Sequence, residues 1–124
     1  MVSPAEKDTF NFNIISGDPD SYTLGFAISG SFNSLTYYNI LVDAIRYRVQ
    51  QIVTKNALTV QGLRSTVDLF DSSHDGYGYV EIDIMNVSRT VISFELYLYN
   101  AGNELKGKAY CSLYFENIAH TPEL

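Results

Sequence analysis

Four polar side chains at helical spacing are the first candidates for chemistry. Asn39, Asp43, Arg46 and Gln50 recur every three or four residues, so on a helix they form one polar stripe beside an apolar one. A carboxylate in such a stripe can act as a general base or as a nucleophile. Asp43 is therefore the leading catalytic candidate. The alternative is an exposed Asp43–Arg46 ion pair, which contributes roughly a few tenths of a kcal/mol.

The segment before this helix offers groups that can hold a negative charge. Ser31, Phe32, Asn33 and Ser34 directly precede the apolar-periodic run that begins at Leu35. Backbone N–H groups at a helix start favour an anion, and the Asn33 amide can add a donor. Asn33 or Ser34 can equally serve as the N-cap. Ser31 can hydrogen-bond a substrate or merely end a strand, and as a nucleophile it has no histidine near it in the sequence.

These candidates depend on one long helix for their positions. Apolar residues recur every three or four positions, which predicts a helix that buries one stripe and ends near Lys55 and Asn56. The stripe comprises Leu35, Tyr38, Leu41, Val42, Ile45, Val49, Ile52 and Val53.

Alternation of apolar and polar residues predicts strands on both sides of the helix. They cover residues 10–14, 22–29, 59–70, 79–85, 91–99 and 108–116. In the last two, one face is aliphatic and the other is rich in tyrosine, so the first should pack on the helix and the second should meet solvent or another subunit. We expect one α+β domain over residues 1–124, with a flexible start at 1–8 and a tail at 118–124. Its central helix should lie against an antiparallel sheet of about five strands, the strands after the helix forming a meander.

Composition limits the class of protein. Of the 124 residues, 46% are hydrophobic and 18% are charged, which excludes a disordered chain. The net charge of −6, without a basic run, argues against a nucleic-acid partner. No apolar stretch long enough for a membrane span and no signal-peptide pattern occur, so we expect a cytoplasmic protein. The single Cys111 excludes an intrachain disulfide, and the ten tyrosines favour an oligomer.

Two stretches resemble the hot-dog superfamily of acyl-thioester enzymes. Residues 28–33, leading into 39–45, are similar to the Gly-His-Phe segment and following helix of β-hydroxyacyl carrier-protein dehydratases. They are closer still to the Gly-His-Phe-Asn entry of FcoT-type fatty acyl-CoA thioesterases. Residues 85–99, with 105–109, resemble the paired C-terminal strands of many hot-dog thioesterases. Ser31 stands where the dehydratases have their catalytic histidine, which disfavours dehydration.

The resemblance implies a hot-dog fold and hydrolysis of an acyl thioester on coenzyme A or acyl carrier protein, at the seam of a homodimer or of a tetramer or hexamer. Asp43 would activate water, while Asn33 and the amides of residues 32–34 would hold the oxyanion. No metal or redox cofactor is implied, since coenzyme A or phosphopantetheine belongs to the substrate. Substrate contacts would come from Tyr22, Phe32, Ser34, Tyr38, Asn39 and Arg89.

Other interpretations remain open at this point. The tyrosines can instead pack as apolar rings, and an exposed arginine can serve only solubility. The chain can also be a dehydratase, isomerase or cyclase acting on a carrier-bound polyketide or fatty acyl chain. A non-catalytic acyl-binding subunit is a third possibility.

Overall fold

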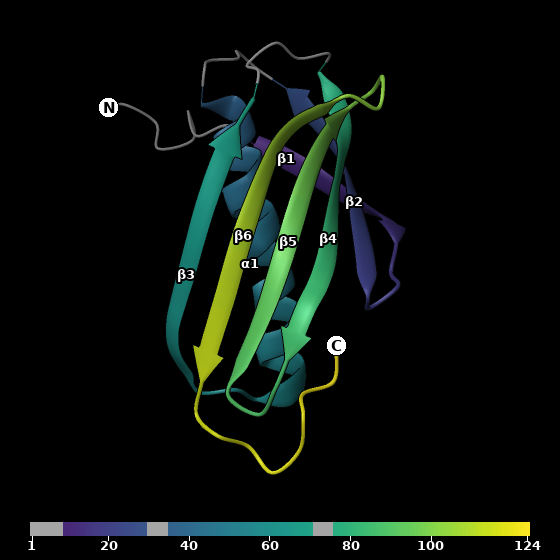
Figure 1. The fold of residues 1–124 in the computed structure, drawn as a ribbon. Coiled ribbons are helices and arrows are strands. Elements are labelled where there is room, and N and C mark those ends of the chain that lie inside the picture. The colour runs from purple at the N-terminus through teal and green to yellow at the C-terminus, as the bar shows by residue number, and fades with distance from the viewer. Residues whose placement is uncertain (1–8, 30–34, 71–75) are drawn as a thin grey trace, which may run out of the picture.

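The computed structural model describes residues 9–29, 35–70 and 76–124, without the side chains of residues 9–11 and 29. In this part of the chain, an antiparallel sheet of six strands curls around one helix (Figure 1). The strands are β1 (Thr9–Ser16), β2 (Ser21–Ser29), β3 (Val60–Leu69), β4 (Tyr77–Val87), β5 (Val91–Asn100) and β6 (Leu105–Phe115), and the helix is α1 (Thr36–Asn56). The expected α+β architecture is confirmed. All six segments predicted as strands are strands, and they join in one sheet, one strand wider than the expected number of about five.

The order of the strands corrects one expectation. They lie in the order β1-β2-β4-β5-β6-β3, so only β4, β5 and β6 form a meander. β3 pairs with β6 instead of with β4, as in the register of Leu63 with Leu113. β4 fills the place beside β2, where Tyr22 pairs with Ile82. Among the described strands, β3 therefore forms one edge of the sheet, and Figure 1 draws none of them on its outer side.

Helix α1 packs its buried face into the curl of the sheet. Its buried residues are Thr36, Tyr37, Ile40, Leu41, Ala44, Ile45, Arg48 and Ile52. The predicted buried stripe was wrong in part, because Leu35 and Tyr38 are 57% and 43% exposed. The sheet covers only one side of the helix, so an apolar stripe wider than that side extends beyond the core. No helix among the described residues is long and apolar enough to cross a membrane.

One end of α1 lies where the sequence predicted it, and the other does not. The N-cap position is Leu35, whose apolar side chain makes no capping hydrogen bond. The prediction that Asn33 or Ser34 is the N-cap was therefore wrong. The C-terminal end lies at Asn56, as predicted. Ala57 follows in the left-handed conformation (φ 51°), and the N–H of Leu58 donates to the Val53 carbonyl at 3.1 Å, which closes the last turn.

The residues after β6 fold back onto α1. The Asn56 amide donates to the Glu123 carbonyl and accepts from the Glu123 N–H, both at 2.8 Å. Arg48, which is 3% exposed, donates to the Leu124 carbonyl at 3.1 Å and lies over the Tyr22 ring at 4.5 Å. Burial lowers the pKa of Arg48, and Tyr22 opposes that shift. A buried arginine in the middle of the helix was not predicted, since charged residues are rarely buried unless they have partners.

The outer face of the sheet carries the expected tyrosines together with carboxylates. The rings of Tyr79 and Tyr99 stack with their centroids 4.9 Å apart. Asp83 pairs across the strands with Glu95, a like-charged contact that destabilises a sheet. The pKa of the neighbouring Glu81 is raised, first by burial and then by the charge of Asp83.

Replacing Glu81 by glutamine is therefore expected to raise the free energy of unfolding at pH 7, by up to about 1 kcal/mol. A carboxyl group whose pKa is higher in the folded state stabilises the fold while it is protonated, and this contribution is lost as the pH rises through that pKa. The advantage of the variant over wild type should thus shrink between about pH 7 and pH 4. Urea titrations at several pH values measure it, with Glu116→Gln at an exposed position as the control. A gain that is independent of pH would contradict the expectation.

Candidate functional site

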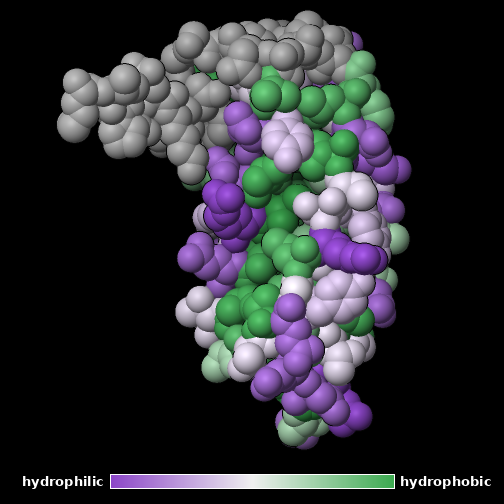
Figure 2. Space-filling model, turned by 90° about the vertical axis from the view of Figure 1, so that its left-hand side faces the viewer, coloured by the Kyte–Doolittle hydropathy of each residue, from purple (hydrophilic) through white to green (hydrophobic). Residues whose placement is uncertain are grey.

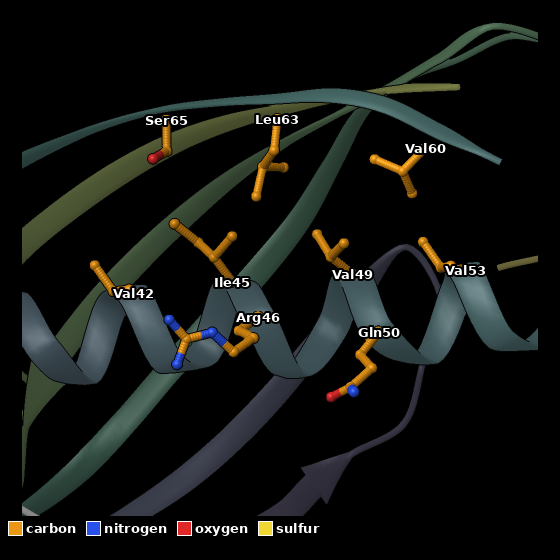
Figure 3. A pocket seen from close by; sticks show the side chains of 9 residues that line it. All are labelled: Val42, Ile45, Arg46, Val49, Gln50, Val53, Val60, Leu63 and Ser65. Carbon is orange, nitrogen blue, oxygen red and sulfur yellow. The ribbon is translucent and has the colours of Figure 1, made fainter. Parts of the chain in front are cut away.

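An apolar groove of about 340 Å³ runs between α1 and the edge strand β3. From β3, the side chains of Val60, Leu63 and Ser65 point down toward the helix, and from α1 a row of aliphatic side chains points up toward them (Figure 3). The lining residues are Val42, Ile45, Arg46, Val49, Gln50, Val53, Val60, Leu63 and Ser65.

The groove exists because β3 stands apart from the core. Across the ladder, Leu63 pairs with Leu113 and Ser65 with Cys111, so both β3 residues share the helix-facing side of the sheet. Leu113 and Cys111 are fully buried, whereas Leu63 is 49% exposed. On the side of the molecule that carries the β3 edge, Figure 2 shows a hydrophobic stripe between hydrophilic borders. An apolar surface left open in this way marks a place for a ligand or a partner.

Asp43 lies on the polar stripe that borders this groove. The Arg46 guanidinium donates to the Asp43 carboxylate at 3.2 Å, and the two side chains are 63% and 27% exposed. Arg46 and Gln50 line the groove and point away from β3, on its open side (Figure 3). The predicted polar stripe therefore exists, and through Arg46 it places a carboxylate beside an apolar channel. The same contact is also the exposed ion pair that was its alternative interpretation.

The other predicted site residues lie at different distances from the groove. Asn39 is half-buried and precedes Asp43 by one turn on the polar stripe, and Tyr38 is one turn before Val42 on the groove side. Tyr22 is in the core and accepts a hydrogen bond from Gln51 at 3.2 Å. Arg89 lies in the turn between β4 and β5, where its carbonyl accepts from the Ile118 N–H.

Asn39 and Tyr38 therefore lie on the same part of α1 as Asp43, whereas Tyr22 and Arg89 do not. Tyr22 lies beneath Arg48, away from the groove. Arg89 lies in the turn that joins β4 to β5, at the end of the molecule where α1 also ends (Figure 1). The remaining predicted residues, Ser31, Phe32, Asn33 and Ser34, lie outside the described residues.

The residues that line the groove from β3 were missed in the sequence. Val60 and Leu63 had been assigned only to a strand, and Val42, Val49 and Val53 to a buried helix stripe. The width of that apolar stripe could have indicated that part of it is not covered by the sheet. Tyr38, Val42, Val49 and Val53 lie on one flank of the helix wheel, and a sheet that covers the opposite flank leaves them uncovered.

Comparisons with known proteins identify the fold. No protein-family model matches the chain, and no curated protein matches it. Among solved structures, a Gln-to-Ala variant of a thioesterase from Pseudomonas aeruginosa aligns with a TM-score of 0.68 at 10% identity, covering 86% of this chain and 82% of that one. The chain has the hot-dog fold.

Two further similar structures contain coenzyme A or acetyl-CoA. A hypothetical thioesterase from Streptococcus pneumoniae with coenzyme A has a TM-score of 0.64 at 15% identity, covering 86% of this chain and 87% of that one. A Streptococcus mutans protein bound to acetyl-CoA has a TM-score of 0.61 at 15% identity, with 86% and 90% covered. At these identities the similarity shows the hot-dog fold and leaves the chemistry to be argued from the residues.

Proposed function

We propose that this protein hydrolyses acyl thioesters, with Asp43 activating the attacking water. The observation that supports this most is the position of the Asp43 carboxylate, held by Arg46 at the border of an aliphatic groove. The groove suits the apolar part of an acyl substrate, and the carboxylate suits its reacting end. The similarity to hot-dog thioesterases adds support at the level of the fold.

The reaction requires a base and a means of holding charge. Asp43 takes a proton from water, and the water oxygen bonds to the thioester carbonyl carbon. The tetrahedral oxyanion then collapses, the carbon–sulfur bond breaks, and the proton passes from Asp43 to the leaving thiolate. The products are a carboxylic acid and a thiol. For the oxyanion, Asn33 and the amides of residues 32–34 stay a prediction, because they lie outside the described residues.

Coenzyme A is the carrier that we propose, because two similar structures are described with coenzyme A or acetyl-CoA. Arg46 pairs with Asp43 and so belongs beside the reacting end, whereas the phosphates of coenzyme A would lie a pantetheine arm away from that end. We further propose a homodimer that forms along β3. Within the described part of the chain this strand has no neighbouring strand on one side, and a second copy there would cover the exposed Val60 and Leu63.

Release of free thiol from a panel of short, long and aromatic acyl-CoA thioesters tests the proposal. Mass spectrometry of the products accompanies it, because hydrolysis yields a free acid, whereas dehydration or isomerisation leaves the thioester intact. Thiol release together with the free acid supports a thioesterase. A folded protein that binds acyl-CoA and releases no thiol from any substrate would overturn it and favour the non-catalytic subunit.

A further inference from the structure

We propose that Arg46 is a second catalytic residue, which donates hydrogen bonds to the oxyanion of the tetrahedral intermediate while it also holds Asp43. This inference rests on the proposed function and adds to it a side chain that stabilises the charge formed in the reaction. The contact between Arg46 and Asp43 then joins an oxyanion donor to the base, and is more than an exposed ion pair.

The backbone N–H groups of α1 beside Asp43 are already bonded within the helix. Asp43 lies about two turns into a helix that begins at Thr36, past the first turn, whose N–H groups have no intrahelical partner. Beyond that turn each N–H donates to the carbonyl four residues earlier. Within the described part of the chain, an oxyanion that forms beside Asp43 therefore needs a donor from a side chain.

Arg46 is the described side chain that both contacts Asp43 and lines the groove. Gln50 also lines the groove, but it lies two turns after Asp43, about 10 Å along the helix axis. Ser65 lines the groove from the opposite wall, on β3 (Figure 3). Arg46 is also the one cation among the described lining residues, in a protein whose net charge is −6. A negative charge that develops in this groove therefore finds its opposite charge at Arg46.

The guanidinium of Arg46 has donors left for a substrate. Its Nη1 donates to Oδ1 of Asp43 at 3.2 Å, which is its one hydrogen bond within the described part of the chain. A guanidinium carries five N–H donors in a planar fork, so the others stay available. Figure 3 shows the guanidinium extending along the open side of the groove toward Val42. Because the side chain is 63% exposed, a bound thioester can reach these donors.

The bond to Arg46 gives the two oxygens of Asp43 different roles. Oδ1 accepts from the guanidinium, which leaves Oδ2 to take a proton from the attacking water. As the water oxygen bonds to the carbonyl carbon, the carbonyl oxygen becomes an oxyanion, and Arg46 donates its remaining N–H groups to it. The oxyanion's electron pair then forms the carbonyl of the acid again, the carbon–sulfur bond breaks, and the proton passes from Asp43 to the thiolate. Arg46 keeps its protons throughout, since a guanidinium is not deprotonated in proteins.

Arg46→Met tests this role, because methionine keeps an unbranched side chain and has neither an N–H donor nor a charge. We expect kcat/KM for acyl-CoA hydrolysis to fall about 10²-fold, the lower end of the usual cost of removing an oxyanion donor. Arg64→Met is the matched control. Arg64 lies on β3 between Leu63 and Ser65, which face the helix, so it lies on the outer face of the sheet. This control should hydrolyse acyl-CoA as wild type does.

The same substitution made in Asp43→Asn separates an oxyanion donor from a residue that only orients Asp43. If Arg46 acted through Asp43 alone, Arg46→Met would cost nothing further once the base is absent, because residues that act as one unit are not additive. An oxyanion still forms when water attacks without a base, so we expect a further loss of about tenfold or more. Single-turnover assays at high protein concentration measure these slow rates.

Binding of a trifluoromethyl ketone analogue of the acyl-CoA gives a readout that needs no turnover. The ketone adds water to form a tetrahedral carbon like that of the intermediate, whereas an S-alkyl-CoA thioether of equal length has no carbonyl. In calorimetric titrations, wild type should bind the ketone about 10²-fold more tightly than the thioether or better. Arg46→Met should lose most of this preference, and Arg64→Met should keep it.

Equal rates in Arg46→Met and Arg64→Met would overturn this inference and leave Arg46 as a surface contact, while the proposed hydrolysis stands. So would a double variant no slower than Asp43→Asn, which would make Arg46 a positioning residue, or a preference for the ketone that survives in Arg46→Met. Loss of activity together with dissociation of a dimer in light scattering would also overturn it, because Arg46 would then act at an interface between copies. A folded wild type that releases no thiol would instead reject the hydrolysis itself, and the oxyanion with it.

Discussion

Replacing Asp43 by asparagine is expected to lower kcat/KM for acyl-CoA hydrolysis by about 10²-fold or more, the usual contribution of a positioned general base. Asparagine keeps the shape of the side chain and can still accept a hydrogen bond from Arg46, but it cannot take a proton from water. The fall should appear in kcat, with little change in the affinity for an alkyl-CoA thioether. Rates of thiol release measure it.

The free energy of unfolding should hardly change in the same variant. The pair with Arg46 is partly exposed, and such pairs contribute about 0.2–1 kcal/mol. Asp68→Asn, on the exposed part of β3, is the control with the same change of charge. Equal losses of activity in both variants, or full activity in Asp43→Asn, would remove Asp43 from the mechanism and leave its pair with Arg46 as a surface contact.

Replacing Gly78 by alanine is expected to destabilise the fold by about 3 kcal/mol or more, the upper range for overpacking. A Cβ atom at this position would lie 2.2 Å from the Tyr99 carbonyl oxygen and 3.1 Å from the Asn100 Cα, both in the backbone of β5. It would also approach the Phe26 ring at 2.9 Å. Backbone cannot move aside as the tip of a side chain can, so β4 and β5 would have to separate. Thermal denaturation should show a midpoint lower by roughly 10 °C.

Gly62→Ala on β3 is the control for the loss of glycine flexibility, because the nearest atom to its added Cβ is 4.0 Å away in the Tyr114 ring. We expect that variant to unfold within about 0.5 kcal/mol of wild type. If both variants unfold alike, the close contact of Gly78 with β5 does not govern stability.

Local patterns in the sequence predicted the elements but not how they pair. The alternation in the last strands gave the correct faces, with Phe94 and Leu113 in the core and Tyr97 and Tyr114 outside. The pairing of β3 with β6 depends on residues about 50 positions apart, such as Leu63 and Leu113. The alternation within a strand does not specify which other strand it pairs with. Short connections favour consecutive pairing, which is why a four-strand meander was expected.

The candidate site was predicted only on its polar side. The spacing of Asn39, Asp43 and Arg46 identified the stripe, because charged and amide side chains are seldom placed in a core. The groove could not be found in the same way, since an aliphatic residue such as Val49 looks the same whether a core or a ligand covers it. What decides between the two is how far the edge strand stands from the helix.

The place of β4 in the sheet also determines the order in which this chain can fold. β2 stays without its second neighbour until β4 has been made, because Tyr22 pairs with Ile82, 60 residues later. β3 likewise waits for β6. On the ribosome, the first half of the chain would therefore expose its apolar strands until nearly all of the sequence has emerged, and we expect slow folding dominated by long-range pairing. Chaperone dependence during synthesis should accordingly be greater than for a helical protein of the same length.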